Sequence, residues 1–337
     1  MSAFTRDGTE NLMRWDRTSA GFMEVWYATA IHSASGCGTW FRYTITSPVD
    51  GAAFCELWGF VFDPDRKRNF AAKQRFPIDR LGPPSGRDDG ALVRIGDAWL
   101  SETHMDGAIS TGDGSLTWSL DLDPAPRCFQ HLPARIRRRA ERKASVVCSP
   151  NLDVAFNGSV TIGGETLSFD DEAGSQSHRW GKRHPLTWAW VHCSRFEGAD
   201  ALLEGVAAKT PIGPLKPTTT FLYLKHAGIE LEFNDLRWVL LARSRYTLPT
   251  WAFTARTDEW KIVGAVRASI EDFVQVEYMD PDGSSRYCAN SEIGDLAIEV
   301  YRRSSNRWVH DASLTARGTA HLEFGEKEPF EELPVAF

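Results

Sequence analysis

The 337-residue chain lacks the features that mark membrane and secreted proteins. No run of apolar residues approaches the length of about eighteen that a transmembrane helix needs. The first eleven residues are polar, and they contain no apolar segment of the kind found at the centre of a secretory signal peptide. We therefore expect a soluble protein that stays in the cytoplasm.

Positive charge is not in excess, since 38 Lys and Arg residues stand against 45 Asp and Glu residues, for a formal net charge of −7. A nucleic-acid-binding protein would show the opposite balance, so we expect no nucleic-acid partner. The sequence also lacks the glycine-rich loops that bind nucleotide phosphates and the tight turn that carries the nucleophilic serine of α/β-hydrolases.

Paired cysteines and metal-binding clusters are missing as well. None of the six cysteines forms a C-x-x-C motif or a cluster with histidine, and scattered cysteines in a chain of this size are typical of reduced, cytoplasmic proteins. Three histidines, His178, His184 and His192, fall on strand-like stretches and not on the helix that a zinc protease needs. The sequence therefore predicts no metal site.

Tryptophan, in contrast, is abundant. The chain has thirteen tryptophans within an otherwise ordinary composition of 42% hydrophobic and 25% charged residues. A ring of this size needs a core or a binding surface to cover it. The placement of the tryptophans therefore carries much of the functional argument.

The dominant hydrophobic period is two, which is typical of strands. Runs rich in aromatic and β-branched residues alternate with turn-forming residues about every ten positions, as in an antiparallel sandwich or barrel. The clearest runs are residues 39–46, 56–62, 117–122, 187–193, 219–225 and 273–279. The sequence predicts an all-β fold with one helix over residues 131–143, while residues 235–245 are ambiguous.

The length of the chain favours two domains. We place the boundary near residue 200, which gives domains over residues 1–200 and 201–337 with about twelve and eight strands. Two proline- and glycine-rich segments, residues 78–90 and 210–217, are expected to be long loops.

Three successive strands repeat one pattern, a tryptophan two residues from a charged side chain. Residues two apart share a face of a strand. The pairs are Glu24 with Trp26, Trp40 with Arg42, and Glu56 with Trp58. If the tryptophans face inward, then Glu24, Arg42 and Glu56 meet inside the barrel. They then form either a structural network that fixes strand register or a site with a buried acid facing a ligand; if the tryptophans face outward, the pattern means little.

A second aromatic pattern lies near the middle of the chain. Trp188, Trp190 and His192 share one face of a predicted strand, and a tryptophan wall can stabilise a carbocation by about 1–2 kcal/mol per ring. Shortly before it, His178 and Trp180 share a face. A lone histidine is more often structural than catalytic, so the neighbourhood of His178 decides its interpretation.

These segments together resemble a known superfamily. The matching residues are Glu24-Val25-Trp26-Tyr27, Trp40-Phe41-Arg42-Tyr43-Thr44, Glu56-Leu57-Trp58, His178-Arg179-Trp180-Gly181 and Trp188-Ala189-Trp190-Val191-His192. The pattern is similar to that of the AttH-like and carotenoid 1,2-hydratase superfamily of lipocalin-like proteins. Its relatives include tocopherol cyclases, kievitone hydratase and lipocalin-like Diels–Alderases. The resemblance covers residues 20–206.

The resemblance implies two consecutive lipocalin-like, antiparallel β-barrel or half-barrel domains with a pocket in or between them. It implies no metal and no organic cofactor, and it implies hydration, cyclisation or rearrangement of an isoprenoid or polyene. The family box supplies a histidine and a tryptophan to the site, which here are His178 and Trp180. The box usually opens with Asp, and Ser177 stands there in this chain. The closest downstream carboxylate is Glu204.

We therefore expect a cofactor-independent hydratase or cyclase that protonates a hydrophobic substrate in a dry, aromatic pocket. A pericyclase, which needs only shape, and a non-catalytic lipid carrier remain alternatives. The candidate catalytic residues are His178, Trp180, Glu204, Glu24 and Glu56. The candidate substrate-binding residues are Trp26, Trp40, Arg42, Trp58, Trp188, Trp190 and His192.

A basic segment adds a further expectation about partners. Its six cationic residues are Arg135, Arg137, Arg138, Arg139, Arg142 and Lys143. Such a segment can contact an anionic membrane surface, but in an acidic protein it is more typical of a solvated helix face or loop. The sequence leaves open whether the protein is a monomer or a dimer.

Overall fold

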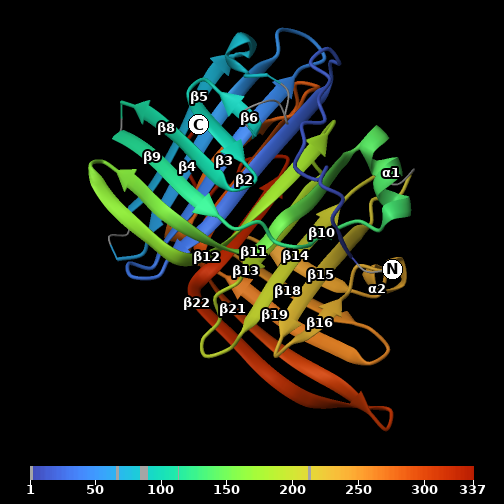
Figure 1. Cartoon of the computed structure of the whole chain (residues 1–337). Coiled ribbons are helices and arrows are strands. Elements are labelled where there is room, and N and C mark those ends of the chain that lie inside the picture. The colour runs from blue at the N-terminus through green and yellow to red at the C-terminus, as the bar shows by residue number, and fades with distance from the viewer. Residues whose placement is uncertain (1–2, 66–67, 84–89, 113, 212–213) are drawn as a thin grey trace.

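The computed structural model describes residues 3–337 apart from 66–67, 84–89, 113 and 212–213. Strands account for 65% of the residues and helices for 5%, which confirms the prediction of an all-β fold. Two antiparallel sheets make up the molecule, and each is formed by one continuous half of the chain (Figure 1).

The first sheet has twelve strands, and its main path runs β5-β4-β3-β2-β12-β11-β9-β8-β7-β6. Strand β10 pairs with both β1 and β11. The strands are β1 (Phe4–Thr5), β2 (Phe22–His32), β3 (Cys37–Ser47), β4 (Phe54–Asp63), β5 (Arg68–Pro77), β6 (Ala91–Ile95), β7 (Ala98–Ser101), β8 (His104–Thr111), β9 (Gly114–Leu122), β10 (Cys128–Gln130), β11 (Ser145–Ile162) and β12 (Glu165–Gly181).

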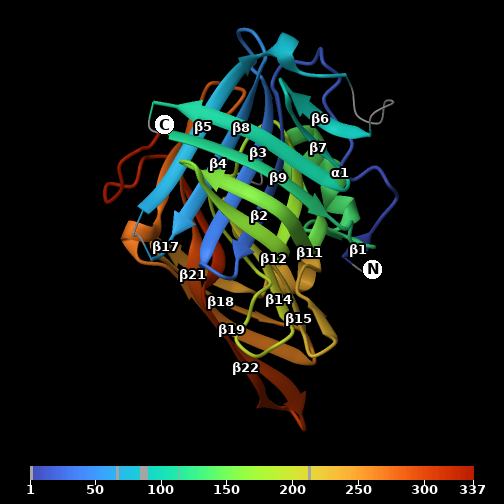
Figure 2. The ribbon, with the colours of Figure 1, turned by 60° about the vertical axis from the view of Figure 1, so that its left-hand side comes forward.

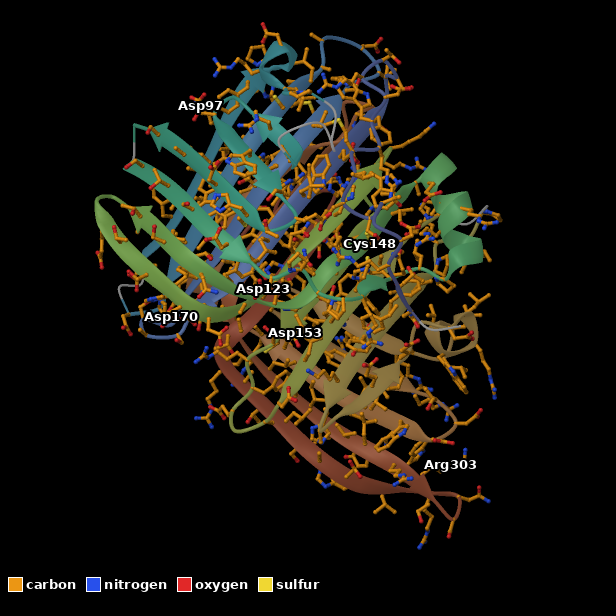
Figure 3. The ribbon with its side chains drawn as sticks, viewed as in Figure 1. Asp97, Asp123, Cys148, Asp153, Asp170 and Arg303 are labelled. Carbon is orange, nitrogen blue, oxygen red and sulfur yellow. The ribbon has the colours of Figure 1, made fainter. Side chains whose placement is uncertain are left out.

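The second sheet has ten strands, in the order β16-β15-β14-β13-β22-β21-β19-β18-β17, and β20 pairs with β21. The strands are β13 (Thr187–Cys193), β14 (Ala201–Lys209), β15 (Thr218–His226), β16 (Ile229–Glu232), β17 (Arg243–Thr247), β18 (Thr250–Arg256), β19 (Trp260–Arg267), β20 (Val274–Met279), β21 (Ser285–Ser304) and β22 (Arg307–Glu326). Arg303 lies near the tip of the long β21–β22 hairpin (Figure 3).

The helices are short. The expected helix over residues 131–143 is confirmed as α1 (Ala134–Lys143), and the ambiguous segment holds α2 (Leu236–Val239) followed by β17. Two 3₁₀ turns, η1 (Ile78–Arg80) and η2 (Ile270–Asp272), complete the set within the described residues. The basic side chains of Arg135, Arg139, Arg142 and Lys143 lie outside the described part of the structure, as do residues 84–89 and 212–213 of the expected loops.

Figure 2 shows that both sheets are curled. Each sheet encloses its own hydrophobic core. In the first core, Trp26, Phe41 and Trp118 are buried among aliphatic side chains. In the second, Trp251 and Phe324 hold the equivalent position. Alternate residues are buried along strands such as β9 and β18, which explains the period of two in the sequence, whereas β3 and β4 are buried on both faces because the second sheet covers them.

The chain passes from the first sheet to the second between Gly181 and Thr187. Strand β13, which precedes the expected boundary at residue 200, pairs with β14 and β22 in the second sheet. The outer faces of the two sheets meet in a further apolar cluster, which includes Trp40 and Phe60 from the first sheet and Trp188 from the second.

Two glycines allow the close packing that defines this inter-sheet region. A Cβ atom at Gly38 on β3 would lie 2.2 Å from the Cβ atom of Glu292 on β21. A Cβ atom at Gly325 on β22 would lie 2.2 Å from Cε2 of the Trp188 ring. Only glycine leaves room for Glu292 to approach β3 and for Trp188 to lie flat over β22.

All six cysteines are buried, and none forms a disulfide. Cys148, for example, lies on β11 in the upper half of Figure 3. No helix in the described ranges has the length and apolar character needed to cross a membrane.

Candidate functional site

The candidate site is a cavity of about 120 Å³ between the facing sides of the two sheets. Its walls come from β2, β3, β11 and β12 on one side, and from β13, β14, β20, β22 and the connection after β12 on the other. The lining residues are Val25, Tyr27, Trp40, Arg42, Val147, Arg179, His184, Pro185, Trp188, Trp190, Val206, Tyr278 and Glu323. Apolar and aromatic side chains dominate, as is usual for small-molecule sites.

Strand pairing explains why these side chains meet. Trp190 on β13 pairs with Val206 on β14 and with Glu323 on β22, so all three project from the same face of the second sheet. In the first sheet, Tyr27 on β2 pairs with Arg42 on β3. Paired residues of antiparallel strands share a face, and the two faces enclose the cavity.

The aromatic rings form continuous walls. The ring of Tyr27 meets Trp190 edge-on at a centroid distance of 5.2 Å. The rings of Trp188 and Tyr278 lie nearly parallel at 6.4 Å, and His184 stacks 5.2 Å from each. Such a wall offers flat, electron-rich surfaces to an apolar ligand.

Glu323 is the one carboxyl group among the described lining residues. Trp188 donates its indole Nε1–H to Oε1 of Glu323. Oε2 lies 3.9 Å from Nε2 of His321, whose Nδ1 lies 2.6 Å from Oε1 of Glu292. A row of ionisable side chains thus leads from the interior of the inter-sheet region to the cavity wall.

Burial controls the protonation of this row. It raises the pKa of Glu292 well above the usual value of 4.5, which favours the protonated carboxyl group. It also lowers the pKa of His321 to about 4, so the imidazole is neutral near pH 7. A protonated Glu292 can donate to Nδ1 of the neutral His321, which places the ring hydrogen on Nε2, the nitrogen that faces Glu323.

Glu204 lies in a neighbouring buried cluster. His131 and Trp190 donate to its Oε1, both at 2.7 Å, and Nδ1 of His192 donates to Oε2 at 3.0 Å. Burial alone would raise the pKa of Glu204, but the hydrogen bonds from His131 and His192 lower it to about 2. Glu204 is therefore a fixed carboxylate that anchors Trp190 rather than a proton donor.

Arg179 and His184 also belong to the polar lining of the cavity. Arg179 donates from Nη2 to the Ser145 hydroxyl and to the carbonyl oxygen of Arg183, both at 3.1 Å. Burial lowers the pKa of Arg179 to about 10, and the charge of Asp280 opposes this shift. Burial lowers the pKa of His184 to about 4, and the Arg179 charge adds to the effect. The guanidinium is thus charged and the imidazole is neutral near pH 7.

The expectation that His178 and Trp180 share a pocket with Trp188 and Trp190 is wrong. His178 pairs with Trp26 across β12 and β2, and both point to the first core rather than to the second sheet. Because side chains alternate along a strand, the neighbours of the box residues, Ser177 and Arg179, take the cavity side. Ser177 itself lies 2.8 Å, Oγ to Oγ, from Ser149.

His178 instead fastens the N-terminal segment to the first sheet. Its Nδ1–H donates to the carbonyl oxygen of Glu10 at 2.6 Å, and its Nε2 lies 2.9 Å from Oε1 of Glu24. Glu24 also accepts the backbone N–H groups of Arg14 and Trp15. All of these contacts join the segment before β2 to the sheet.

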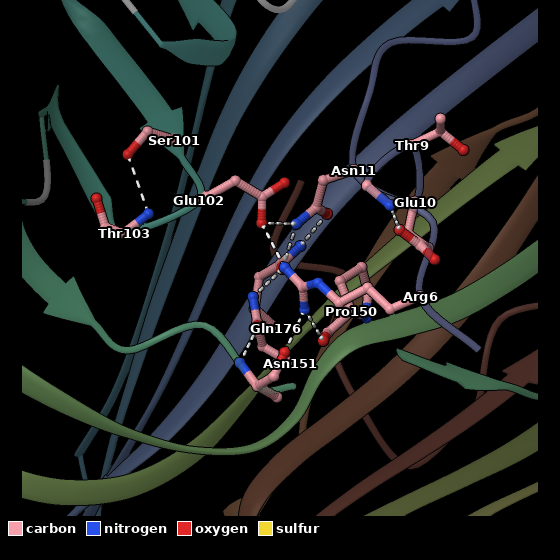
Figure 4. A network of polar contacts seen from close by, with 12 residues as sticks. Arg6, Thr9, Glu10, Asn11, Ser101, Glu102, Thr103, Pro150, Asn151 and Gln176 are labelled. Carbon is pink, nitrogen blue, oxygen red and sulfur yellow. Dashed lines mark hydrogen bonds and ion pairs between the residues drawn. The ribbon is translucent and has the colours of Figure 1, made fainter. Parts of the chain in front are cut away.

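A neighbouring amide network holds the same segment, as Figure 4 shows. Asn11 donates to Gln176 at 3.1 Å and to Glu102 at 3.2 Å. Arg6 contacts Glu102 at 3.1 Å and donates to the carbonyl oxygen of Pro150 at 3.1 Å. The surroundings of His178 are therefore structural in character.

The expected cluster of Glu24, Arg42 and Glu56 does not form. Strands β2, β3 and β4 are neighbours, but Glu24 pairs with Ile45 and faces the first core, on the opposite side from Arg42. Glu56 shares the face of Arg42 but bonds Nε of Arg75 at 2.8 Å. The register of β2 against β3 causes this separation, since a shift of one residue exchanges the two faces.

The structure thus divides the predicted site residues into groups. Trp40, Arg42, Trp188 and Trp190 line the cavity. Glu56 and Trp58 line a smaller adjacent cavity of about 50 Å³. Glu204 and His192 lie in the neighbouring buried cluster, and Glu24, Trp26, His178 and Trp180 face away from both cavities.

Sequence reasoning missed Glu323, His321, Glu292, Tyr27 and Tyr278. The sequence does contain a pattern that could have indicated two of them. His321 and Glu323 alternate with buried Ala320, Leu322 and Phe324 in one strand. A polar face opposite an apolar one normally means solvent, yet His321 is buried too. Among the described residues, no group of three or more His, Cys, Asp or Glu side chains is arranged to hold a metal ion.

Comparison with known proteins gives the class of this fold. It matches an AttH protein (NE1406) of Nitrosomonas europaea with a TM-score of 0.57 and 13% identity, over 91% of this chain and 93% of that one. It matches kievitone hydratase of Nectria haematococca with a TM-score of 0.55 and 9% identity, over 97% and 94% of the two chains. These likenesses show that the chain shares the fold of the AttH protein and of kievitone hydratase, the fold that the predicted resemblance implies.

The family model for tocopherol cyclase-like proteins matches residues 152–326, just over half of the chain, and the protein belongs to this family. The match includes all of the second sheet, and thus the region after residue 206, where the sequence alone indicated only strands. An uncharacterized protein of Mycobacterium tuberculosis (strain ATCC 25618 / H37Rv), Rv0493c, is 28% identical over 93% of this chain and 89% of its own length.

Proposed function

We propose that the protein is a cofactor-independent enzyme of the hydratase or cyclase type, acting on a hydrophobic isoprenoid or polyene in the inter-sheet cavity. The observation that carries the proposal is Glu323, a carboxyl group in the wall of a largely aromatic cavity. Membership of the tocopherol cyclase-like family and the likeness to kievitone hydratase support this type of chemistry.

The proposed reaction begins with transfer of a proton from Glu323 to one carbon of an alkene, which leaves positive charge on the other carbon. Either water or a hydroxyl group of the substrate then adds to that carbon and gives its extra proton to the Glu323 carboxylate, which restores the acid and gives hydration or cyclisation. The rings of Trp188, Trp190 and Tyr278 line the same cavity and can stabilise the charge, by about 1–2 kcal/mol per ring.

The row behind Glu323 supports its carboxyl group from the interior. Nε2 of His321 faces Glu323 Oε2 at 3.9 Å, and Nδ1 of the same ring lies 2.6 Å from Oε1 of Glu292. His321 and Glu292 act through Glu323 and are positioning residues in this scheme.

The test is a product assay with a panel of geraniol, geranic acid and farnesol, analysed by liquid chromatography and mass spectrometry. The wild type is expected to form a product that has gained one water, or one of equal mass and altered retention. Glu323→Gln should lower the rate by about 100-fold or more, the usual effect of losing a proton-transfer group.

The matched control is Glu326→Gln, on the same strand but outside the residues that line the cavity. It should keep the wild-type rate. A Glu323→Gln variant as active as the wild type would contradict the proposal. Binding of the panel by the wild type without any product would indicate the non-catalytic carrier instead.

A further inference from the structure

Arg42 stands in the wall shared by the two cavities between the sheets. Its side chain is buried, with 4% of the residue exposed. The guanidinium carbon lies 4.4 Å from the ring centroid of Tyr278 and 4.9 Å from that of Trp58. Nε donates to the Thr44 hydroxyl at 2.9 Å. These contacts occupy one of the five N–H donors of the group.

No carboxylate pairs with this guanidinium in the part of the chain that the structure describes. The two acidic side chains of the smaller cavity are already engaged, since Glu56 bonds Arg75 at 2.8 Å and Glu277 accepts from Ser285. Lys73 and Arg75 line the same small cavity. Three cations therefore face two carboxylates, and positive charge is in excess.

The wall of the larger cavity shows the same imbalance. It contains two guanidinium groups, Arg42 and Arg179, against the single carboxyl group of Glu323, which already accepts from Trp188. The indole Nε1–H of Trp40, two residues from Arg42 on the same face of β3, has no acceptor among the described residues. The unmet polar groups here are therefore hydrogen-bond donors.

A buried cation without a counter-charge is costly, and a ligand that supplies an acceptor with negative charge removes that cost. We propose that the substrate is an amphipathic acid, whose carboxylate binds Arg42 and whose apolar body lies against the aromatic walls. The inference rests on the proposed function and narrows its substrate class. It also neutralises Arg42, whose charge would otherwise oppose a carbocation in the same cavity.

The test compares two ligands with the same ten-carbon isoprenoid skeleton, geranic acid and geraniol, by isothermal titration calorimetry at neutral pH. The wild type should bind the acid at least about tenfold more tightly than the alcohol, since hydrogen bonds between charged groups are the stronger ones. Arg42→Met should remove this preference, while Arg42→Lys should keep part of it. Lys209→Met, which removes an exposed cation on β14 outside both cavities, should leave both affinities unchanged.

The outcomes separate this inference from the proposed function. Equal affinities of the wild type for acid and alcohol would overturn the acid class and leave the proposed function standing. If Arg42→Met lowers the affinity for the acid and for the alcohol equally, the acid class is also overturned, because the side chain then serves only to shape the cavity. Failure of the wild type to bind either ligand would contradict both the acid class and the proposed function. The wild-type comparison needs no variant to fold.

Discussion

At the scale of single residues, the surroundings of His178 and Glu292 separate structural from functional roles. His178 is buried with both ring nitrogens facing oxygen atoms, of Glu10 and Glu24, that hold the N-terminal segment. Glu292 is buried next to His321, at the far end of the row that leads to Glu323, and burial raises its pKa. A titratable group serves chemistry only if the fold connects it to a cavity.

Replacing His178 should therefore damage folding more than function. His178→Ala leaves Glu24 buried without its side-chain partner, which typically costs about 3–5 kcal/mol. We expect a loss of this size in urea unfolding, while ligand affinity per folded molecule stays within about threefold of the wild type. The exposed His310 provides the control, since His310→Ala should change stability little. Unchanged stability together with lost activity would show that His178 belongs to the site.

Replacing Glu292 should change how stability depends on pH. The folded state holds the Glu292 proton above pH 4.5, where the unfolded chain has lost it, so wild-type stability falls as pH rises through this range. Glu292→Gln has no such proton. We expect its melting temperature, relative to the wild type, to increase between about pH 5 and about pH 8.

The exposed Glu331 offers a matched control, and Glu331→Gln should show no such trend. A constant difference between Glu292→Gln and the wild type at both pH values would mean that Glu292 is ionised in the folded protein.

At the scale of strands, alternation predicted which residues share a face but not what each face meets. Trp188, Trp190 and His192 do share a face, as the sequence indicated. Strands β2 and β3 are neighbours, yet Tyr27 and not Trp26 pairs with Arg42. Register and the packing of a second sheet against the outer face depend on contacts far apart in the sequence. These contacts put the site between the sheets and leave His178 outside it.

The same scale gives a prediction for β22, where Gly325 lies beneath the Trp188 ring. A methyl group at this position meets the ring at 2.2 Å and must displace it. We expect Gly325→Ala to destabilise the protein by about 1–3 kcal/mol, the usual cost of overpacking, and to shift tryptophan emission. Gly112→Ala, at a glycine with no atom within 4 Å of the added Cβ, should do neither. If the two variants behave alike, Trp188 is not held against β22.

At the scale of the whole molecule, each curled sheet has its own filled core, and the candidate binding cavity lies between the two sheets. Strands β3 and β4 of the first sheet, with one tryptophan each, and β13 of the second, with two, supply this boundary. The excess of tryptophan in the sequence is thereby explained, because the inter-sheet region needs large rings in addition to those of two cores. A ligand in this cavity contacts both halves of the chain and should stabilise them together.

The measurement that tests this account most directly is calorimetric binding of geranic acid to a protein whose cavity has been filled. Val206 lines the cavity, and Val206→Trp adds an indole to the three that already line it. The half-exposed Val263 on β19 serves as the control site. We expect Val206→Trp to melt cooperatively and to lose affinity at least about tenfold, a change of about 1.4 kcal/mol, while Val263→Trp binds like the wild type. A folded Val206→Trp variant with wild-type affinity would show that the ligand binds elsewhere.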